Sequence, residues 1–400
     1  MTKNDLKTAW INEIPDDWRM VRASLTVTPV ERPPLPDDEV VTCFRDGEVT
    51  LRSNRRTDGF TVSFQEIGYQ HIKTGDLVIH SMDGGWGAIG VSDSDGKASP
   101  VVHAYQSEEN DVKFIAYVLR AMAYSGYLIA QTKGIRERST QFDRKSFSNL
   151  YLPLPDPDTQ RRIADYLDKE ISEMDALIDE FKELVESLET RKVSLIDKYV
   201  LGEPDTDKMR LAFFGEAITG ITYSPQDIVD DGGIAVYRSG NVQNSRVDRT
   251  DLVYVNLEIG DKYRFKEGDI LMCSRNGSAK LVGKNALVEP KDIGRSWGAF
   301  MTVIRTSIND YLYWFYRSSR FRELQGGFAT TTINQLTIGF LNSMVIPVPS
   351  KERRQEIVET LNREVSKMDT LIEESTRLIE NLKARKTALI TEVVTGRKEV

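Results

Sequence analysis

The segment ISEMDALIDE at residues 171–180 occurs again, little changed, as VSKMDTLIEE at residues 365–374. Both copies belong to a longer repeat in which residues 153–202 align with residues 347–396 without a gap. About 20 of about 50 aligned residues are identical, which indicates an internal duplication. The repeat is too long for a solenoid unit, so we expect a duplicated module made of one globular domain and one helix.

Apolar residues in both copies recur at alternating spacings of four and three, which is typical of a coiled-coil seam. Gly202 and Gly396 follow the two seams and are expected to end the helices. The first seam comprises Leu167, Ile171, Met174, Ile178, Phe181, Val185 and Leu188, and the second comprises Leu361, Val365, Met368, Ile372, Ile379, Leu382 and Leu389.

Two matching seams in one chain can pair with each other. If the globular domains lie at opposite ends of the helices, the helices run antiparallel and the modules are related by a pseudo-twofold internal repeat. The alternative is that each helix covers only its own domain. Lys192 and Lys386 occupy equivalent seam positions near the helix ends. We expect their amines to extend to water; the alternative is a polar pair that fixes the register.

Composition limits the possible classes of protein. The 400 residues carry a net charge of −8, and residues 156–205 hold about 15 acidic against about 7 basic side chains. The sequence contains no apolar run long enough for a membrane span and no signal-peptide pattern at its start. Two cysteines and three histidines form neither a zinc motif nor a disulfide framework, so we expect a cytoplasmic protein.

The pattern predicts an α+β protein with four segments: a head at 1–152, a helical region at 153–205, a second head at 206–346 and a second helical region at 347–400. The heads share weaker landmarks. Residues 73–81 (KTGDLVIHS) resemble residues 266–274 (KEGDILMCS), and both read as a turn followed by an apolar strand. Because the heads have diverged more than the helices, we expect them to recognise different ligands.

Loops rich in arginine and side-chain amides occur at comparable places in both heads. Arginine reads guanine edges, asparagine and glutamine read adenine, and lysine, serine and threonine hold phosphates. The candidates in the first head are Arg52, Asn54, Arg55, Arg56, Lys133, Arg136, Arg138, Ser139, Thr140 and Gln141; those in the second are Arg238, Asn241, Gln243, Asn244, Arg246, Arg275, Asn276, Lys280, Thr331 and Asn334.

Motifs for catalysis are weak. Residues 85–90 (GWGAIG) fit the dinucleotide fingerprint, but a turn follows them where that motif needs a helix. No nucleophile has a base beside it in the sequence, and no metal-ligand motif occurs. We therefore expect no catalytic residue, no metal and no cofactor bound by this chain.

Several motifs resemble the specificity subunit of type I restriction-modification systems, and the resemblance covers nearly the whole chain. A Pro-x-Pro strand followed by a turn rich in glutamine and arginine opens each helical region, as LPLPDPDTQRRI at 152–163 and IPVPSKERRQEI at 346–357. IPDDW at 14–18 and YRSGN at 237–241 also fit the family. In the second turn, Gln355 does not align with Gln160.

The resemblance implies a reader of double-stranded DNA in which each head is a target-recognition domain for one half of a split, asymmetric target. It implies that the helices set the spacing between the halves and recruit two methyltransferase subunits and the restriction/translocase subunits. S-adenosylmethionine, ATP and Mg would then be bound by those partners. The alternatives are a coiled-coil adaptor whose heads bind proteins and not DNA, and an enzyme that uses the loop at 85–90.

Overall fold

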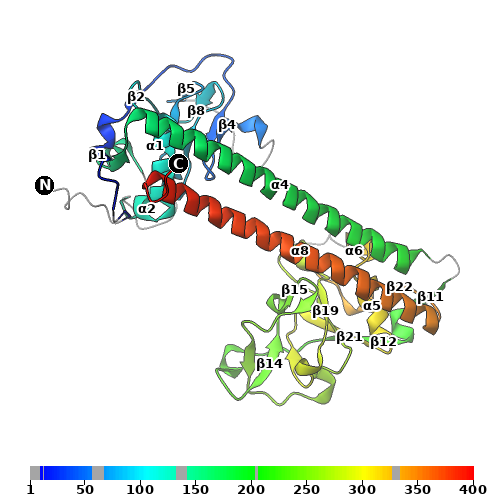
Figure 1. Cartoon of the computed structure of the whole chain (residues 1–400). Coiled ribbons are helices and arrows are strands. Elements are labelled where there is room, and N and C mark those ends of the chain that lie inside the picture. The colour runs from blue at the N-terminus through cyan, green and yellow to red at the C-terminus, as the bar shows by residue number, and fades with distance from the viewer. Residues whose placement is uncertain (1–9, 12, 56–66, 132–141, 203–205, 327–333) are drawn as a thin grey trace. The chain divides into compact units, whose positions relative to one another are not determined.

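The fold was analysed in a computed structural model that describes residues 10–11, 13–55, 67–131, 142–202, 206–326 and 334–400. The chain divides into two compact units (Figure 1). Unit 1 contains residues 1–181 and 377–400, and unit 2 contains residues 182–376. Each unit therefore holds one head and one part of each long helix.

In unit 1 the strands are β1 (Arg19–Arg22), β2 (Thr28–Val30), β3 (Val41–Cys43), β4 (Val49–Leu51), β5 (Gln70–Ile72), β6 (Leu77–His80), β7 (Ile89–Val91), β8 (Gly96–Ala98), β9 (Val102–Gln106) and β10 (Tyr151–Leu154). The helices are α1 (Val112–Tyr124), α2 (Tyr127–Gln131) and α3 (Arg144–Ser148), followed by the first long helix, α4 (Pro157–Leu201).

In unit 2 the strands are β11 (Asp207–Arg210), β12 (Gly215–Thr219), β13 (Ile228–Val229), β14 (Ile234–Tyr237), β15 (Val242–Gln243), β16 (Arg246–Val247), β17 (Val253–Val255), β18 (Ile270–Cys273), β19 (Asn285–Leu287), β20 (Ser296–Trp297), β21 (Met301–Thr306) and β22 (Val345–Val348). The helices are α5 (Asn309–Phe315), α6 (Ser319–Gly326) and α7 (Ile338–Ser343), followed by the second long helix, α8 (Lys351–Val394).

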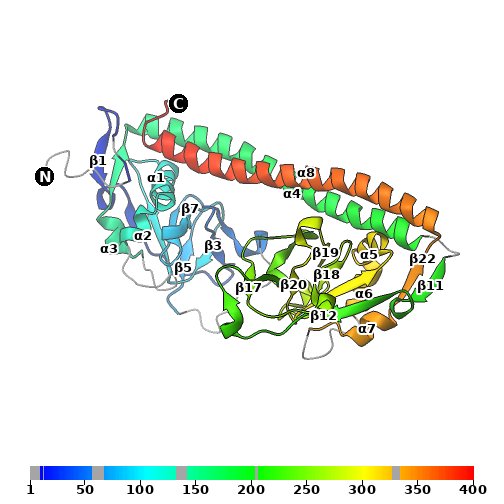
Figure 2. The same cartoon turned by 90° about the horizontal axis from the view of Figure 1, so that it is seen from below.

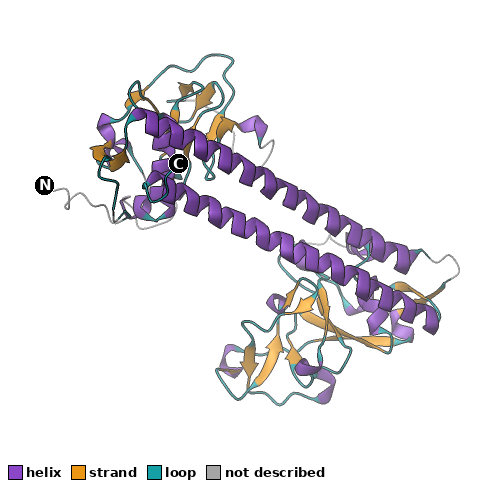
Figure 3. Cartoon of the chain, in the orientation of Figure 1, coloured by secondary structure: helices purple, strands orange, loops and turns teal. Residues whose placement is uncertain are grey.

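Both heads are built on an antiparallel four-stranded sheet of the same connectivity. Its order is β2-β9-β6-β7 in the first head and β12-β21-β18-β19 in the second. In each head the opening strand also pairs with the Pro-x-Pro strand, as β1 with β10 and β11 with β22. Figure 3 shows strands in both heads and helix in the repeated segments. The α+β prediction is confirmed.

The shared Lys-x-Gly-Asp motif forms the same turn in both heads. Asp76 accepts the backbone N–H of Lys73 and Asp269 that of Lys266, each at 2.8 Å. The glycine within each turn has a positive φ, 89° at Gly75, which glycine adopts without strain. Both aspartates are buried, and each is neutralised by an arginine at 2.6 Å: Arg32 in the first head and Arg305 in the second.

The long helices pair antiparallel within each unit. In unit 1 the start of α4, including Ile163 and Leu167, shares a core with the end of α8, including Ile390 and Val394 (Figures 1 and 2). In unit 2 the end of α4, with Ile196, packs with the start of α8. The alternative in which each helix covers only its own domain is therefore wrong.

Each head completes its core with the end of the helix that belongs to the other repeat. The core of the first head, which includes α1 and β6, also contains Leu389, Ile390, Val393 and Val394 of α8. The core of the second head contains Ile196 and Val200 of α4. Ile196 and Ile390 are equivalent positions of the repeat. Isoleucine therefore fills the same place in the core of each head.

Equivalent ion pairs connect the two helices in both units. The amine of Lys192 lies 2.8 Å from Asp369 in unit 2, and the amine of Lys386 lies 2.6 Å from Asp175 in unit 1. Both lysine side chains are largely buried, at 12% and 14% exposure. Of the two alternatives for these lysines, the structure therefore shows the polar pair and not the amine extended to water, and such pairs can specify register.

The turns that open the helices explain the offset glutamine. The buried side chain of Gln160 donates to the carbonyl of Pro155 at 3.0 Å. At the equivalent position of the second repeat, Arg354 donates to the carbonyl of Pro349 at 2.6 Å. Gln355 is exposed. The arginine thus replaces the glutamine of the first repeat by satisfying the same kind of acceptor.

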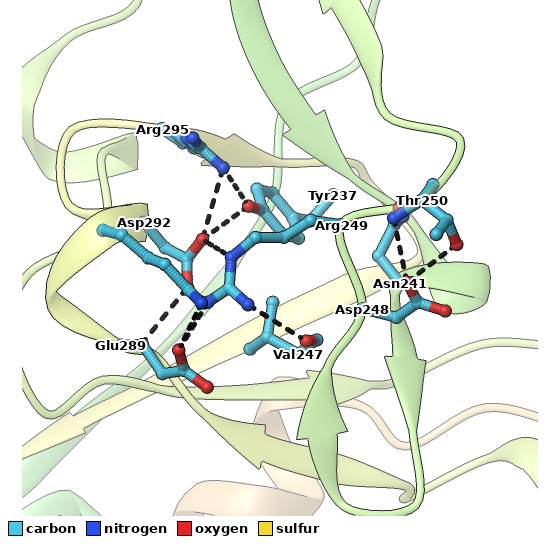
Figure 4. Close-up of polar contacts among 10 residues, drawn as sticks. Tyr237, Asn241, Val247, Asp248, Arg249, Thr250, Glu289, Asp292 and Arg295 are labelled. Atoms are coloured by element: carbon cyan, nitrogen blue, oxygen red, sulfur yellow. Dashed lines mark hydrogen bonds and ion pairs between the residues drawn. The ribbon is translucent and has the colours of Figure 1, made fainter.

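A buried polar network stabilises the second head (Figure 4). Asp292 is fully buried and accepts from Arg249 at 2.6 Å and from the Tyr237 hydroxyl at 2.6 Å. Burial alone would raise the pKa of Asp292, but the hydrogen bonds from Arg249 and Tyr237 outweigh it and lower the pKa below 3.8. Burial raises the pKa of Tyr237 to about 12, so its hydroxyl remains a donor.

The exchange of helix ends can be tested with one pair of equivalent substitutions. We expect Ile390→Ala to destabilise the first head and Ile196→Ala the second, each by about 2–5 kcal/mol, because each leaves a cavity in that core. Hydrogen exchange followed by mass spectrometry would locate the loss of protection. If each variant instead weakened the head that precedes its own helix, the shared cores would be refuted.

The buried network makes the stability of the second head depend on pH. Because the pKa of Asp292 is lowered by folding, its contribution is present above the ordinary value of 3.8 and is lost as the pH falls through the folded pKa. At neutral pH we expect Asp292→Asn to cost about 3–5 kcal/mol. Denaturant titrations should show this difference shrinking below about pH 4; a constant difference would contradict the assignment.

Candidate nucleic-acid interface

Three loops of the second head that the sequence singled out meet in the structure. The side chain of Asn276, in the loop after β18, donates to the Ser239 hydroxyl at 3.2 Å. The Asn276 backbone N–H donates to the carbonyl of Asn334 at 3.3 Å, and the Asn334 side chain donates to the carbonyl of Gly277 at 3.1 Å. The loops that follow β14 and β18 and the segment before α7 therefore form one surface.

A cavity of about 740 Å³ opens beside these loops. Its lining combines hydroxyl, amide, carboxylate and aromatic groups, among them Tyr223, Arg238, Gln243, Asp248, Thr250 and Phe300. Donors and acceptors of this variety, arranged around a concave surface, suit a ligand with a mixed hydrogen-bonding edge.

Some predicted contact residues instead hold the loop together. Asn241 is 2% exposed, and its side chain accepts from the Arg238 backbone at 2.8 Å and donates to the Thr250 carbonyl at 2.9 Å. Because both the oxygen and the nitrogen of its amide are hydrogen-bonded to the backbone, Asn241 stabilises the loop and does not offer its amide to a base. Arg238 pairs with Asp251 at 3.0 Å, whereas Gln243 and Lys280 are exposed.

The β15–β16 hairpin holds two further predicted residues, Asn244 at its tip and Arg246 beside the long helix α8. Asn244 and Ser245 form its tip in the left-handed conformation, with φ of 49° and 58°. The Tyr313 hydroxyl donates to the Ser245 carbonyl at 3.0 Å, and burial raises the pKa of Tyr313, so it remains a donor. Arg246 lies 3.5 Å from Glu373 of α8. Arg246 therefore faces the long helix, whereas Asn244 lies exposed at the tip of the hairpin.

In the first head, Arg52, Asn54 and Arg55 follow β4 in one short helical turn. Asn54 donates to the Thr50 hydroxyl at 2.8 Å, and Arg52 donates to that of Thr42 at 3.3 Å.

Arg55 lies between Asp46 and Glu48, at 2.8 and 2.7 Å, and stacks over Phe44. Its charge is neutralised within the head, which disfavours the predicted reading role. The remaining candidates, Arg56, Lys133, Arg136, Arg138, Ser139, Thr140, Gln141 and Thr331, lie outside the described residues.

Sequence reasoning missed Arg45 in the first head, although a signal for it exists. The segment FRDGEV at 44–49 resembles YRSGNV at 237–242, so Arg45 aligns with Arg238. Arg45 pairs with Asp83, in the loop after β6, at 2.7 Å. The loop after β3 thus contacts the loop after β6, just as the loop after β14 contacts the loop after β18 in the second head.

The electrostatics of these loops favour binding over catalysis. Burial lowers the pKa of His80, whose neutral Nδ1 accepts from the Asp83 backbone at 3.1 Å and helps to hold that loop. Burial also raises the pKa of the Cys273 thiol, which disfavours a thiolate nucleophile. The glycine-rich residues 85–90 lead into strand β7 and not into a helix. Within the described ranges, no cluster of three or more metal-ligating side chains occurs.

A search of the same described residues finds no helix with both the length and the apolar character needed to cross a membrane.

Residues 204–381 match the family model of the type I restriction modification DNA specificity domain. Over 188 residues the chain is 27% identical to the specificity subunit of the type I restriction enzyme StySPI from Salmonella potsdam. That alignment covers 45% of this chain and only 40% of the relative's own length. The specificity subunit of the MjaVIII enzyme from Methanocaldococcus jannaschii is 21% identical over 416 residues, or 97% of this chain and 94% of that protein.

The fold is similar to that of a chain in a solved type I R-M system, a structure concerned with complex assembly and conformational transition. The TM-score is 0.73 at 16% identity, with 97% of this chain and 100% of the other covered. The match to the domain model, the named relatives and this shared fold agree with the repeated architecture of two heads and two helices. The chain is therefore similar in sequence, over its second half, and in fold to the specificity subunits of type I restriction-modification systems.

Proposed function

We propose that this chain is the DNA sequence-recognition subunit of a type I restriction-modification complex. The observation that carries the proposal is the pairing of one shared scaffold with two different sets of loops. The sheet order and the helix contacts are the same in both heads, whereas the loops after β6 and β18 carry different side chains. Each head would read one half of a split, asymmetric target.

The long helices would set the number of unread base pairs between the halves and dock the other subunits. Leu177 and Leu184 of α4 and their repeat equivalents, Leu371 and Leu378 of α8, are between 42% and 47% exposed. Exposed leucines at repeated positions suit binding of two copies of one partner. We propose two methyltransferase subunits there, with restriction/translocase subunits completing a cytoplasmic complex.

In this proposal the chain itself catalyses nothing. S-adenosylmethionine would be held by the methyltransferase subunits, and ATP and Mg by the partner subunits that use them. The described loops support a recognition role because they offer hydrogen-bonding groups around a concave surface.

DNA binding by the chain together with its methyltransferase partner should depend strongly on salt. Neutralising phosphates releases counterions, so we expect affinity for a target duplex to fall about 1,000-fold or more between 50 and 200 mM salt. Fluorescence anisotropy with target and scrambled duplexes would measure both affinity and selectivity. An adaptor with protein-binding heads would bind neither duplex, and that result would end the DNA proposal.

Replacing residues 206–345 by the second head of another family member should change one half of the target and leave the other half unchanged. The replacement must keep apolar residues against Ile196 and Val200, because these helix residues belong to the second head's core. Mapping N6-methyladenine in host DNA would give both halves and their spacing. A change in both halves, or in neither, would contradict independent reading by the heads.

A further inference from the structure

Equivalent loops in the two heads can be aligned by their backbone hydrogen bonds. In the first head, the N–H of Ser81 donates to the carbonyl of Val101 at 2.7 Å, and the N–H of Phe142 donates to that of Ser81 at 2.7 Å. In the second head, Ser274 makes the same two bonds, with Phe300 at 3.0 Å and with Leu336 at 2.8 Å. The loops that begin after Ser81 and Ser274 therefore occupy the same place on their sheets.

In each head, one of these loops contributes to a pair formed by an exposed arginine and an exposed aromatic ring. In the second head, the Arg275 guanidinium lies 5.2 Å from the centre of the Phe300 ring, which is 58% exposed. In the first head, Arg45 lies 5.8 Å from the ring of Trp86, and its side chain is 65% exposed. The loop after Ser274 supplies the arginine in the second head, and the loop after Ser81 supplies the ring in the first head. The same kind of pair is thus formed by residues at different positions of the two heads.

Among the described residues, Arg275 differs from the other arginines of these loops, including Arg55 stacked over Phe44, in having no carboxylate partner. Arg55 is neutralised by two carboxylates, Arg238 pairs with Asp251, and Arg249 lies in the buried network. In the described part of the chain, no carboxylate is paired with Arg275, and Arg45 contacts Asp83 through Nε and Nη2, leaving Nη1. A ring beneath a guanidinium restricts its motion while leaving its N–H edge exposed.

We propose that Arg275 on Phe300 and Arg45 on Trp86 are specificity-determining pairs, each presenting a guanidinium to a guanine in one half of the target. This rests on the proposed DNA-recognition function. The guanine O6 and N7 atoms accept two parallel N–H bonds from an arginine. A guanidinium that is already held over a ring loses less conformational freedom when it forms these bonds. Because Nε and Nη2 of Arg45 already donate to Asp83, the first head would make the weaker contact with guanine.

The test measures the base preference of the full chain bound to its methyltransferase partner, using a library of duplexes randomised across both halves of the target. We expect Arg275→Ala to abolish the preference for guanine at one base pair and to weaken binding of the preferred duplex about 5- to 150-fold. Phe300→Leu should weaken preference at the same base pair, and Arg45→Ala should act in the other half. Phe213→Ala removes a still more exposed ring of the second head, at 74% against 58% for Phe300, and should change no preference.

Outcomes separate the two proposals. If the wild-type complex is not sequence-selective, the DNA-recognition function itself fails. If the wild type is selective but Arg275→Ala leaves every base preference intact, or weakens all duplexes equally with a smaller salt dependence, the guanidinium contacts at most a phosphate and the pair is not a reader. Thermal unfolding of each variant, unchanged from the wild type, shows that the comparison concerns folded protein.

Discussion

The rest of the structure depends on the burial of each long helix's last turns in the core of the opposite repeat's head. Ile390 and Val394 of α8 are buried among residues of α1 and β6, and Ile196 and Val200 of α4 are buried beside α5. This arrangement requires that the helices run antiparallel and that both be continuous. The Lys–Asp pairs then favour one register, because a shift along the seam would leave two largely buried lysines without partners.

The loops can differ between the heads because the scaffold beneath them is held by independent contacts. The buried aspartate of the Lys-x-Gly-Asp turn is neutralised by an arginine from a different part of the head in each case, Arg32 before the sheet's central strands and Arg305 within β21. In the second head, the Asp292 network adds further stabilising contacts. The loop around Ser239 is held by a separate hydrogen bond from Asn276. Side chains above these supports can change without loss of the fold.

The amino-acid sequence predicts the helices and the α+β class well, since a periodic apolar pattern and a gapless repeat report directly on burial. It also identifies the loops around Arg238, Asn276 and Asn334, which the structure brings together. It does not predict which side chains in the candidate loops of either head are already hydrogen-bonded or ion-paired, because that depends on contacts between segments far apart in the chain. Asn241 and Arg55 illustrate this: their residue types suit base reading, yet backbone groups and two carboxylates occupy them. The sequence gives only a weak signal for Arg45, because the similarity of FRDGEV at 44–49 to YRSGNV at 237–242 is short.

The placement of Leu389–Val394 in the first head has a consequence for biosynthesis. A ribosome releases the first head early, but the residues that close its core follow the second head in the sequence and are made after it. Until then, apolar side chains of α1 and α4 stay exposed to water on the nascent polypeptide, where they can associate with chaperones or aggregate. The domain synthesised first is therefore completed only after the whole second head has been synthesised.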